Sequence, residues 1–202
     1  GDPDASALDT VLQRATAPYS GGSCGTWSGF TTIATGVANP ASAPIDDGTC
    51  AMFAIVVHNR TGLVDTLTGA QVVRADRSAP AGSLIAPPGP VGGSIAVAVA
   101  ASDAGSGLAS ASIDYSGPET GSICSTASPA PWATTCNWNT TARAPGTYTV
   151  TLTATDVAGT AMPSVSTSVI VDNAAPTISG VTVTGTTNAS AQHVVAGAVP
   201  LV

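Results

Sequence analysis

Short segments with a two-residue repeat of apolar side chains recur along most of this chain. Residues 94–100 place Ile95, Val97 and Val99 at every second position, and residues 147–155 alternate threonine with larger or apolar residues. Successive side chains of a β-strand point to opposite faces, so this period predicts strands that pack one face inward. Turns rich in Gly, Pro and Asp separate the segments. The pattern therefore predicts a chain of short strands.

The most complete series of such segments lies between residues 80 and 173. Strands are predicted at 81–85, 94–100, 108–115, 131–138, 147–155 and 164–171, with Cys124 in a loop. This number approaches the seven strands that an immunoglobulin-type sandwich places in about one hundred residues. We therefore expect residues 77–173 to be one complete sandwich.

A repeated stretch divides the chain into units. Asp172-Asn173-Ala174-Ala175-Pro176 joins two strand-like runs, and Asp76-Arg77-Ser78-Ala79-Pro80 follows another such run in the same way. The two prolines lie 96 residues apart, which is close to the length of one sandwich domain. The spacing predicts three segments, at 1–76, 77–173 and 174–202.

The first and third segments each match only part of the complete unit. The matches between the first and second are Leu8 with Leu108, Cys24 with Cys124, 48–50 with 146–148, and 59–62 with 156–159. Nothing in the first segment matches 81–100, so we expect it to lack the two opening strands. Residues 177–202 look like the opening strands of a third unit. The apolar residues expected to form an interface there are Ile178, Val181, Val183, Val194 and Val195.

Composition supports an all-β chain and excludes some partners. Aromatic residues make up 4%, charged residues 8%, and the formal net charge is −7. The five arginines are scattered and lysine is absent, so the clustered cations that nucleic acids require are missing. No run approaches the roughly 20 apolar residues of a membrane-spanning helix, and the first residues do not resemble a signal peptide. A surface so poor in charge favours an extracellular setting.

The repeated motifs resemble those of a known class of domain. Asp76–Pro80, Asp103–Leu108, Gly146–Tyr148 and Asp172–Pro176 resemble the signatures of bacterial Ig-like repeat domains. These domains occur in tandem in large secreted and cell-surface proteins, including adhesins, stalks and fibre components. The resemblance implies an all-β fold of tandem immunoglobulin-like β-sandwiches, with incomplete units at both chain ends. It brings no catalytic residues, so we expect no enzymatic activity.

Four cysteines fall two to each of the first two segments. One pair per unit suggests the disulfides Cys24–Cys50 and Cys124–Cys136, formed in an oxidising compartment. Zinc is an alternative, but no pair has metal-ligand spacing. Reduced core thiols are the other alternative.

Other polar residues give weaker signals. Asp103, Asp156, Asp172 and Asn173 are candidates for a calcium site between units, with the Asp46-Asp47 pair behind them. Hydrogen bonds to turn amides are the favoured interpretation of these aspartates, so we expect neither a metal nor another cofactor. His58 and His193 are the two histidines, and neither lies near a serine-containing nucleophile motif.

These observations favour a structural role. We expect a segment of an extracellular repeat protein that forms an extended rod with neighbouring units. Residues 177–202 of one chain could complete the first unit of the next, which would build a filament head to tail. The alternative is an adhesin or carbohydrate-binding module that uses loops near Trp27, Trp132 and Asp46-Asp47 to bind a surface glycan or protein.

Overall fold

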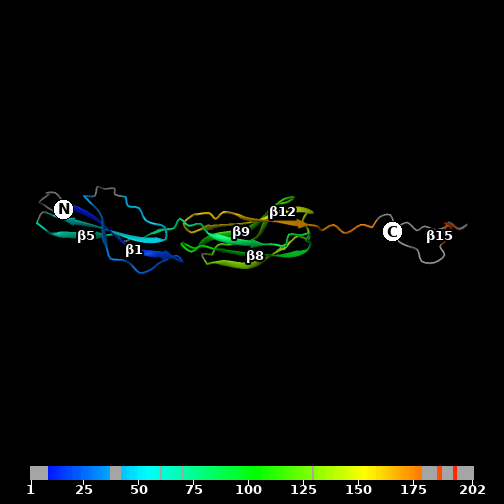
Figure 1. The fold of residues 1–202 in the computed structure, drawn as a ribbon, viewed down its shortest axis with the longest axis horizontal. Helices are drawn as coiled ribbons and strands as arrows, with labels where there is room; N and C mark the ends of the chain where they lie inside the picture. The colour runs from blue at the N-terminus through cyan, green and yellow to red at the C-terminus, as the bar shows by residue number, and fades with distance from the viewer. Residues whose placement is uncertain are drawn as a thin grey trace.

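A computed structural model describes residues 9–36, 42–59, 61–69, 71–128 and 130–178, together with the backbone of 186–187 and 193–194. The described residues form strands and no helix, which confirms the all-β class. The described residues therefore contain no helical segment that could span a membrane. Two units, the N-terminal unit (9–75) and the central unit (81–171), lie end to end, and residues 172–178 leave the central unit at its far end (Figure 1).

The central unit contains two antiparallel sheets. Its strands are β7 (Ala81–Ile85), β8 (Ser94–Ser102), β9 (Leu108–Ser116), β10 (Gly121–Thr126), β11 (Trp132–Asn139), β12 (Gly146–Asp156) and β13 (Val165–Val171). One sheet has the order β10-β9-β12-β13 and the other the order β11-β8-β7. The six strands expected from the sequence are present. The prediction of a loop at Cys124 was wrong, because β10 pairs with β9 there in spite of its irregular register.

Alternate residues of the two sheets meet in one continuous core. Val97 on β8 and Val150 and Leu152 on β12 are fully buried, while the residues between them are more exposed. The same cluster includes residues from β9, β11 and β13. The two sheets therefore pack face to face as a β-sandwich.

Three aromatic rings fill one part of this core. The ring of Tyr115 stacks on Trp138 with centroids 5.0 Å apart, and Tyr148 meets the two rings edge-on at 5.8 and 5.4 Å. The hydroxyl of Tyr148 donates a hydrogen bond to the carbonyl oxygen of Ala144 at 3.0 Å. Burial raises the pKa of Tyr148 above its ordinary value. The Arg143 guanidinium lies over the Tyr115 ring, 5.2 Å from its centroid.

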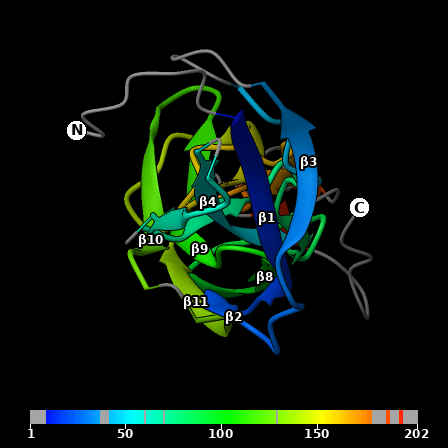
Figure 2. The ribbon, with the colours of Figure 1, turned by 90° about the vertical axis from the view of Figure 1, so that its left-hand side faces the viewer.

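The N-terminal unit is built on one sheet. Its strands are β1 (Asp9–Ser20), β2 (Ser23–Cys24), β3 (Thr31–Thr35), β4 (Thr49–His58), β5 (Val64–Thr68) and β6 (Val73–Ala75). The sheet has the order β2-β1-β4-β5, with β3 also paired to β1 and β6 to β4. The described residues of this unit form no second sheet. Figure 2 looks along the long axis, with this unit in front of the central unit.

One loop has the same hydrogen bonds in both units. The Asn59 side-chain oxygen accepts a hydrogen bond from the Leu63 amide at 2.9 Å, as Asp156 does from the Thr160 amide at 2.7 Å. In each loop a glycine with a positive φ, 82° or 92°, stands three residues after that side chain. The described residues of the two matched loops therefore share these hydrogen bonds and the positive φ of the glycine.

Both pairs of cysteines are bonded. Cys124 on β10 is joined to Cys136 on β11, so this disulfide links the two sheets of the central unit. Cys24 on β2 is joined to Cys50 on β4, and both of these strands pair with β1. Two disulfides suggest an oxidising environment such as the extracellular space.

The C-terminal segment is described only in part. Ile178 is 89% exposed. The backbone of Val194 belongs to β15 (His193–Val194), which pairs with β14 (Thr186–Thr187). Val181, Val183 and Val195, which the sequence also assigned to an interface, lie outside the described residues. Their role stays a prediction.

Candidate functional site at the junction of the two units

The loop between β8 and β9 has a fixed turn set by Asp103. One oxygen of the Asp103 carboxylate accepts hydrogen bonds from the amides of Gly105 at 3.0 Å and Gly107 at 2.8 Å. This is the Asx-turn arrangement expected from the sequence. Gly107 has φ of 84°, which a residue with a side chain rarely adopts. The turn presents the backbone of 104–106 toward the N-terminal unit.

Asp76 contacts this loop from the linker between the units. Its Oδ2 accepts a hydrogen bond from the Ser106 amide at 2.6 Å, and its Oδ1 accepts one from the Ser78 amide at 3.2 Å. Gly105 packs directly against the carboxylate, because a Cβ at this position would lie 2.5 Å from the Asp76 Cγ and both oxygens. A glycine at 105 therefore allows the close approach.

Asp156 approaches the same place from the end of β12. It is 1% exposed, and its Oδ1 accepts the hydrogen bond from the Thr160 amide. Its Oδ2 is buried and has no hydrogen-bond partner among the described residues. Buried polar atoms are nearly always hydrogen-bonded, so this oxygen is an exception that requires an explanation.

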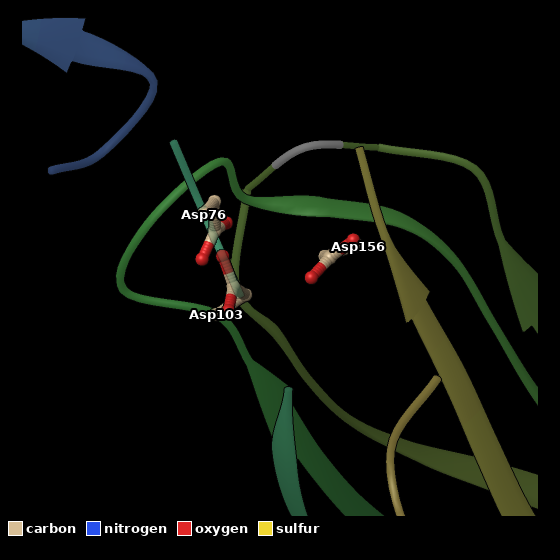
Figure 3. A group of neighbouring side chains, drawn as sticks. All are labelled: Asp76, Asp103 and Asp156. Carbon is tan, nitrogen blue, oxygen red and sulfur yellow. The ribbon is translucent and has the colours of Figure 1, made fainter. Parts of the chain in front are cut away.

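The three aspartates converge at the junction. Asp76, Asp103 and Asp156 each offer a carboxylate oxygen, and these atoms all lie within 4.8 Å of one another. Asp156 faces the other two side chains across the cluster, with one oxygen directed toward them (Figure 3). No ion pair with a basic side chain neutralises the cluster, since the ion pair found in the described residues joins Arg143 to Glu119 elsewhere. The site therefore concentrates negative charge.

The N-terminal unit hydrogen-bonds to the same loop. The amides of Gly21 and Gly22, at the turn between β1 and β2, donate to the carbonyl oxygens of Ala104 and Gly105, each at 2.9 Å. The two units are thus joined by backbone hydrogen bonds as well as by the covalent linker.

Asp47 holds the linker to the N-terminal unit. One of its oxygens accepts a hydrogen bond from the Arg77 amide at 2.6 Å, and the other accepts one from the Ser78 hydroxyl at 2.8 Å. The Arg77 amide and then the Ser78 hydroxyl hold the pKa of Asp47 below its ordinary value, because they favour the charged carboxylate. The Arg77 guanidinium adds a hydrogen bond to the carbonyl oxygen of Ile45 at 3.0 Å.

Asp172 and Asn173, which were also considered for calcium, lie at the opposite end of the central unit. Asp172 accepts a hydrogen bond from the Ala174 amide at 2.9 Å, much as Asp76 does from Ser78. The Asn173 side-chain amide donates to the carbonyl oxygens of Thr140 at 2.6 Å and Arg143 at 3.0 Å. The sequence named Asp103 and Asp156 as candidates together with Asp172 and Asn173. The structure brings the first two together and adds Asp76, which the sequence did not name. The signal was available in the equivalence of Asp76 with Asp172.

The aromatic residues considered for ligand binding are dispersed. Trp138 is 3% exposed and belongs to the core of the central unit. Trp27 and Trp132 are half-buried and line two separate shallow hollows, one on each unit. His58 is the last residue of β4.

No protein-family model matches the chain, and no curated protein matches it either. Functional inference therefore depends on the geometry of the chain itself.

Proposed function

We propose that this chain is a structural segment of an extracellular Ig-like repeat protein, in which rigid units follow one another as a rod. The observation that carries the proposal is the junction. The linker is hydrogen-bonded to the N-terminal unit through Asp47 and to the central unit through Asp76, and Gly21 and Gly22 bond directly across it. A linker held from both sides fixes the orientation of its two neighbours.

Features of the central unit support the Ig-like interpretation. A buried tyrosine whose hydroxyl bonds to a backbone carbonyl a few residues upstream is typical of these sandwiches, and Tyr148 makes that contact with Ala144. The loop shared by Asn59 and Asp156 supports a repeat relationship between the units. The two disulfides support an extracellular location.

Small-angle X-ray scattering tests the rod. The control is a variant with Gly-Ser-Gly-Ser inserted between Ala79 and Pro80, which supplies a flexible linker. The wild type is expected to scatter as one elongated particle. Its pair-distance distribution should end at a better-defined maximum dimension than that of the control. Indistinguishable profiles would contradict a fixed junction and with it the spacer role.

Head-to-tail assembly is a second candidate, favoured by the N-terminal unit. Leu12 pairs with Ile55 and Ile55 with Leu67, which forms an apolar row across the sheet. Ile55 is 39% exposed and Leu67 is 73% exposed. Strands donated by residues 177–202 of a neighbouring chain would cover such a surface.

Deletion of residues 177–202 tests this assembly. Electron microscopy is expected to show filaments for the wild type and none for the deletion variant, while Ile178→Asp should weaken them. Filaments that persist unchanged after the deletion, or a wild type that forms none, would refute the idea. Glycan or host-protein recognition stays an alternative prediction, which an array probed with the whole chain would test.

A further inference from the structure

We propose that Asp76, Asp103 and Asp156 bind one Ca²⁺ ion at the junction between the units. This site is independent of the spacer role, because it depends only on the chemistry of the three side chains. The sequence favoured turn hydrogen bonds for Asp103 and Asp156, and those bonds occupy one oxygen of each. The other oxygen of Asp103 and of Asp156 remains for an ion, whereas both oxygens of Asp76 accept hydrogen bonds and would contact the ion through a remaining lone pair.

The spacing of the cluster suits a shared ion. Calcium lies about 2.3–2.6 Å from its oxygen ligands, so two ligands on opposite sides of it are roughly 4.6–5.2 Å apart. The three carboxylate oxygens lie within 4.8 Å of one another. One ion can therefore contact all three, and water or backbone carbonyl groups would complete its six to eight ligands.

The buried oxygen of Asp156 points to a ligand independently of this spacing. Asp156 is 1% exposed, and its Oδ2 has no hydrogen-bond partner among the described residues. One of the two oxygens of its carboxylate is directed toward the other two carboxylates (Figure 3). A buried carboxylate oxygen without a partner is strongly unfavourable. A cation in the cluster supplies that partner and also offsets the repulsion among the three like charges.

The ligand set distinguishes calcium from other metals. All three side chains are carboxylates, and zinc sites in proteins are built mainly on nitrogen and sulfur ligands. Magnesium usually retains several waters and takes one or two carboxylates, whereas calcium accepts a larger and less regular set of protein oxygens. Three carboxylates from separate segments therefore favour calcium.

The position of the site gives the ion a mechanical effect. Asp76 belongs to the linker, while Asp103 and Asp156 belong to the central unit. A bound ion would therefore tie the linker to two loops of that unit, beside the hydrogen bonds from Gly21 and Gly22. In the N-terminal unit the residue equivalent to Asp156 is Asn59, which carries no charge.

Calorimetric titration of the chelator-treated whole chain with CaCl₂ tests the proposal. The wild type is expected to bind one Ca²⁺, and Asp76→Asn and Asp156→Asn are each expected to weaken binding by about tenfold or more, because each removes a charged ligand. Asp65→Asn is the matched control, since Asp65 is an exposed carboxylate on β5 outside the cluster. A parallel titration with MgCl₂ tests the choice of metal.

Amide NMR spectra provide a second measurement that needs no variant. Five amides donate hydrogen bonds to the three carboxylates, so Ca²⁺ should shift their resonances most: those of Ser78, Gly105, Ser106, Gly107 and Thr160. Absence of binding at millimolar Ca²⁺, binding unaffected in Asp76→Asn, or shifts confined to other residues would overturn the site. Magnesium affinity equal to or above that for calcium would overturn the choice of ion.

Discussion

The two disulfides should matter to different degrees in the two units. Cys24 and Cys50 are 26 residues apart, and Cys124 and Cys136 are 12 apart. On the chain-entropy model, closing these loops stabilises the folded state by about 3.5 and about 2.8 kcal/mol, respectively. The first disulfide therefore contributes somewhat more by loop length alone.

The surrounding packing enlarges that difference. The central unit has a continuous core between two sheets, whereas the described residues of the N-terminal unit form one sheet and leave Leu67 73% exposed. Small domains with little buried apolar surface depend most on such covalent links. Removal of Cys24–Cys50 should therefore unfold its unit, while the central unit should survive the removal of Cys124–Cys136.

Hydrogen exchange measured by mass spectrometry resolves the two units. In Cys24→Ala/Cys50→Ala, peptides from 9–59 should lose protection while those from β8, β9 and β12 keep it. In Cys124→Ala/Cys136→Ala, all of these peptides should stay protected, with the unfolding free energy of the central unit lower by about 2.8 kcal/mol. The reasoning would be refuted if peptides of the central unit lost protection before those of the N-terminal unit. Equal losses of protection in both double variants would also refute it.

Three further predictions concern the junction, the core and pH. Gly105→Ala should shift the amide resonances of Gly21 and Gly22 and lower the melting temperature, because its methyl group would lie 2.5 Å from the Asp76 carboxylate. Gly29→Ala is the control, since the space around Gly29 is open, and it should change neither the resonances nor the melting temperature. Tyr148→Phe should reduce the unfolding free energy in urea by about 1 kcal/mol through loss of the hydrogen bond to Ala144, and an unchanged midpoint would count against that bond. The Arg143 guanidinium and the Ala144 amide hold the pKa of Glu119 below its ordinary value of 4.5. Between the folded-state pKa and this ordinary value, the unfolded state therefore binds more protons than the folded state. The stability that Glu119 contributes is therefore present above about pH 4.5 and lost as pH falls through the folded-state pKa. Glu119→Gln should flatten this part of a plot of unfolding free energy against pH. A plot identical to that of the wild type would contradict the prediction.

Much of the central unit could be predicted from the sequence, because its strands alternate. The runs around Val97 and Val150 place large apolar residues on one face, and the structure buries those faces against each other. The strand β10 was missed because Gly121–Thr126 has no regular alternation and joins the edge of its sheet with a shifted register. A strand of this kind is defined by its neighbour rather than by its own pattern.

The site was harder to predict than the fold. The Asx turn at Asp103 is a local feature, so its hydrogen bonds follow from sequence spacing. The approach of Asp76 depends on how two units are placed relative to each other, and the burial of Asp156 depends on packing at the end of β12. These are long-range properties, and sequence spacing carries no direct information on them.

The central claim is that the two units form one rigid body with a fixed junction. Residual dipolar couplings of backbone amides in a weakly aligned sample test it most directly. A single alignment tensor should fit the couplings of 9–36, 42–59 and 81–171 together, with the orientation that the hydrogen bonds of Gly21, Gly22 and Asp47 impose. Two tensors of different magnitude, one for each unit, would show that the units reorient independently and would contradict the account.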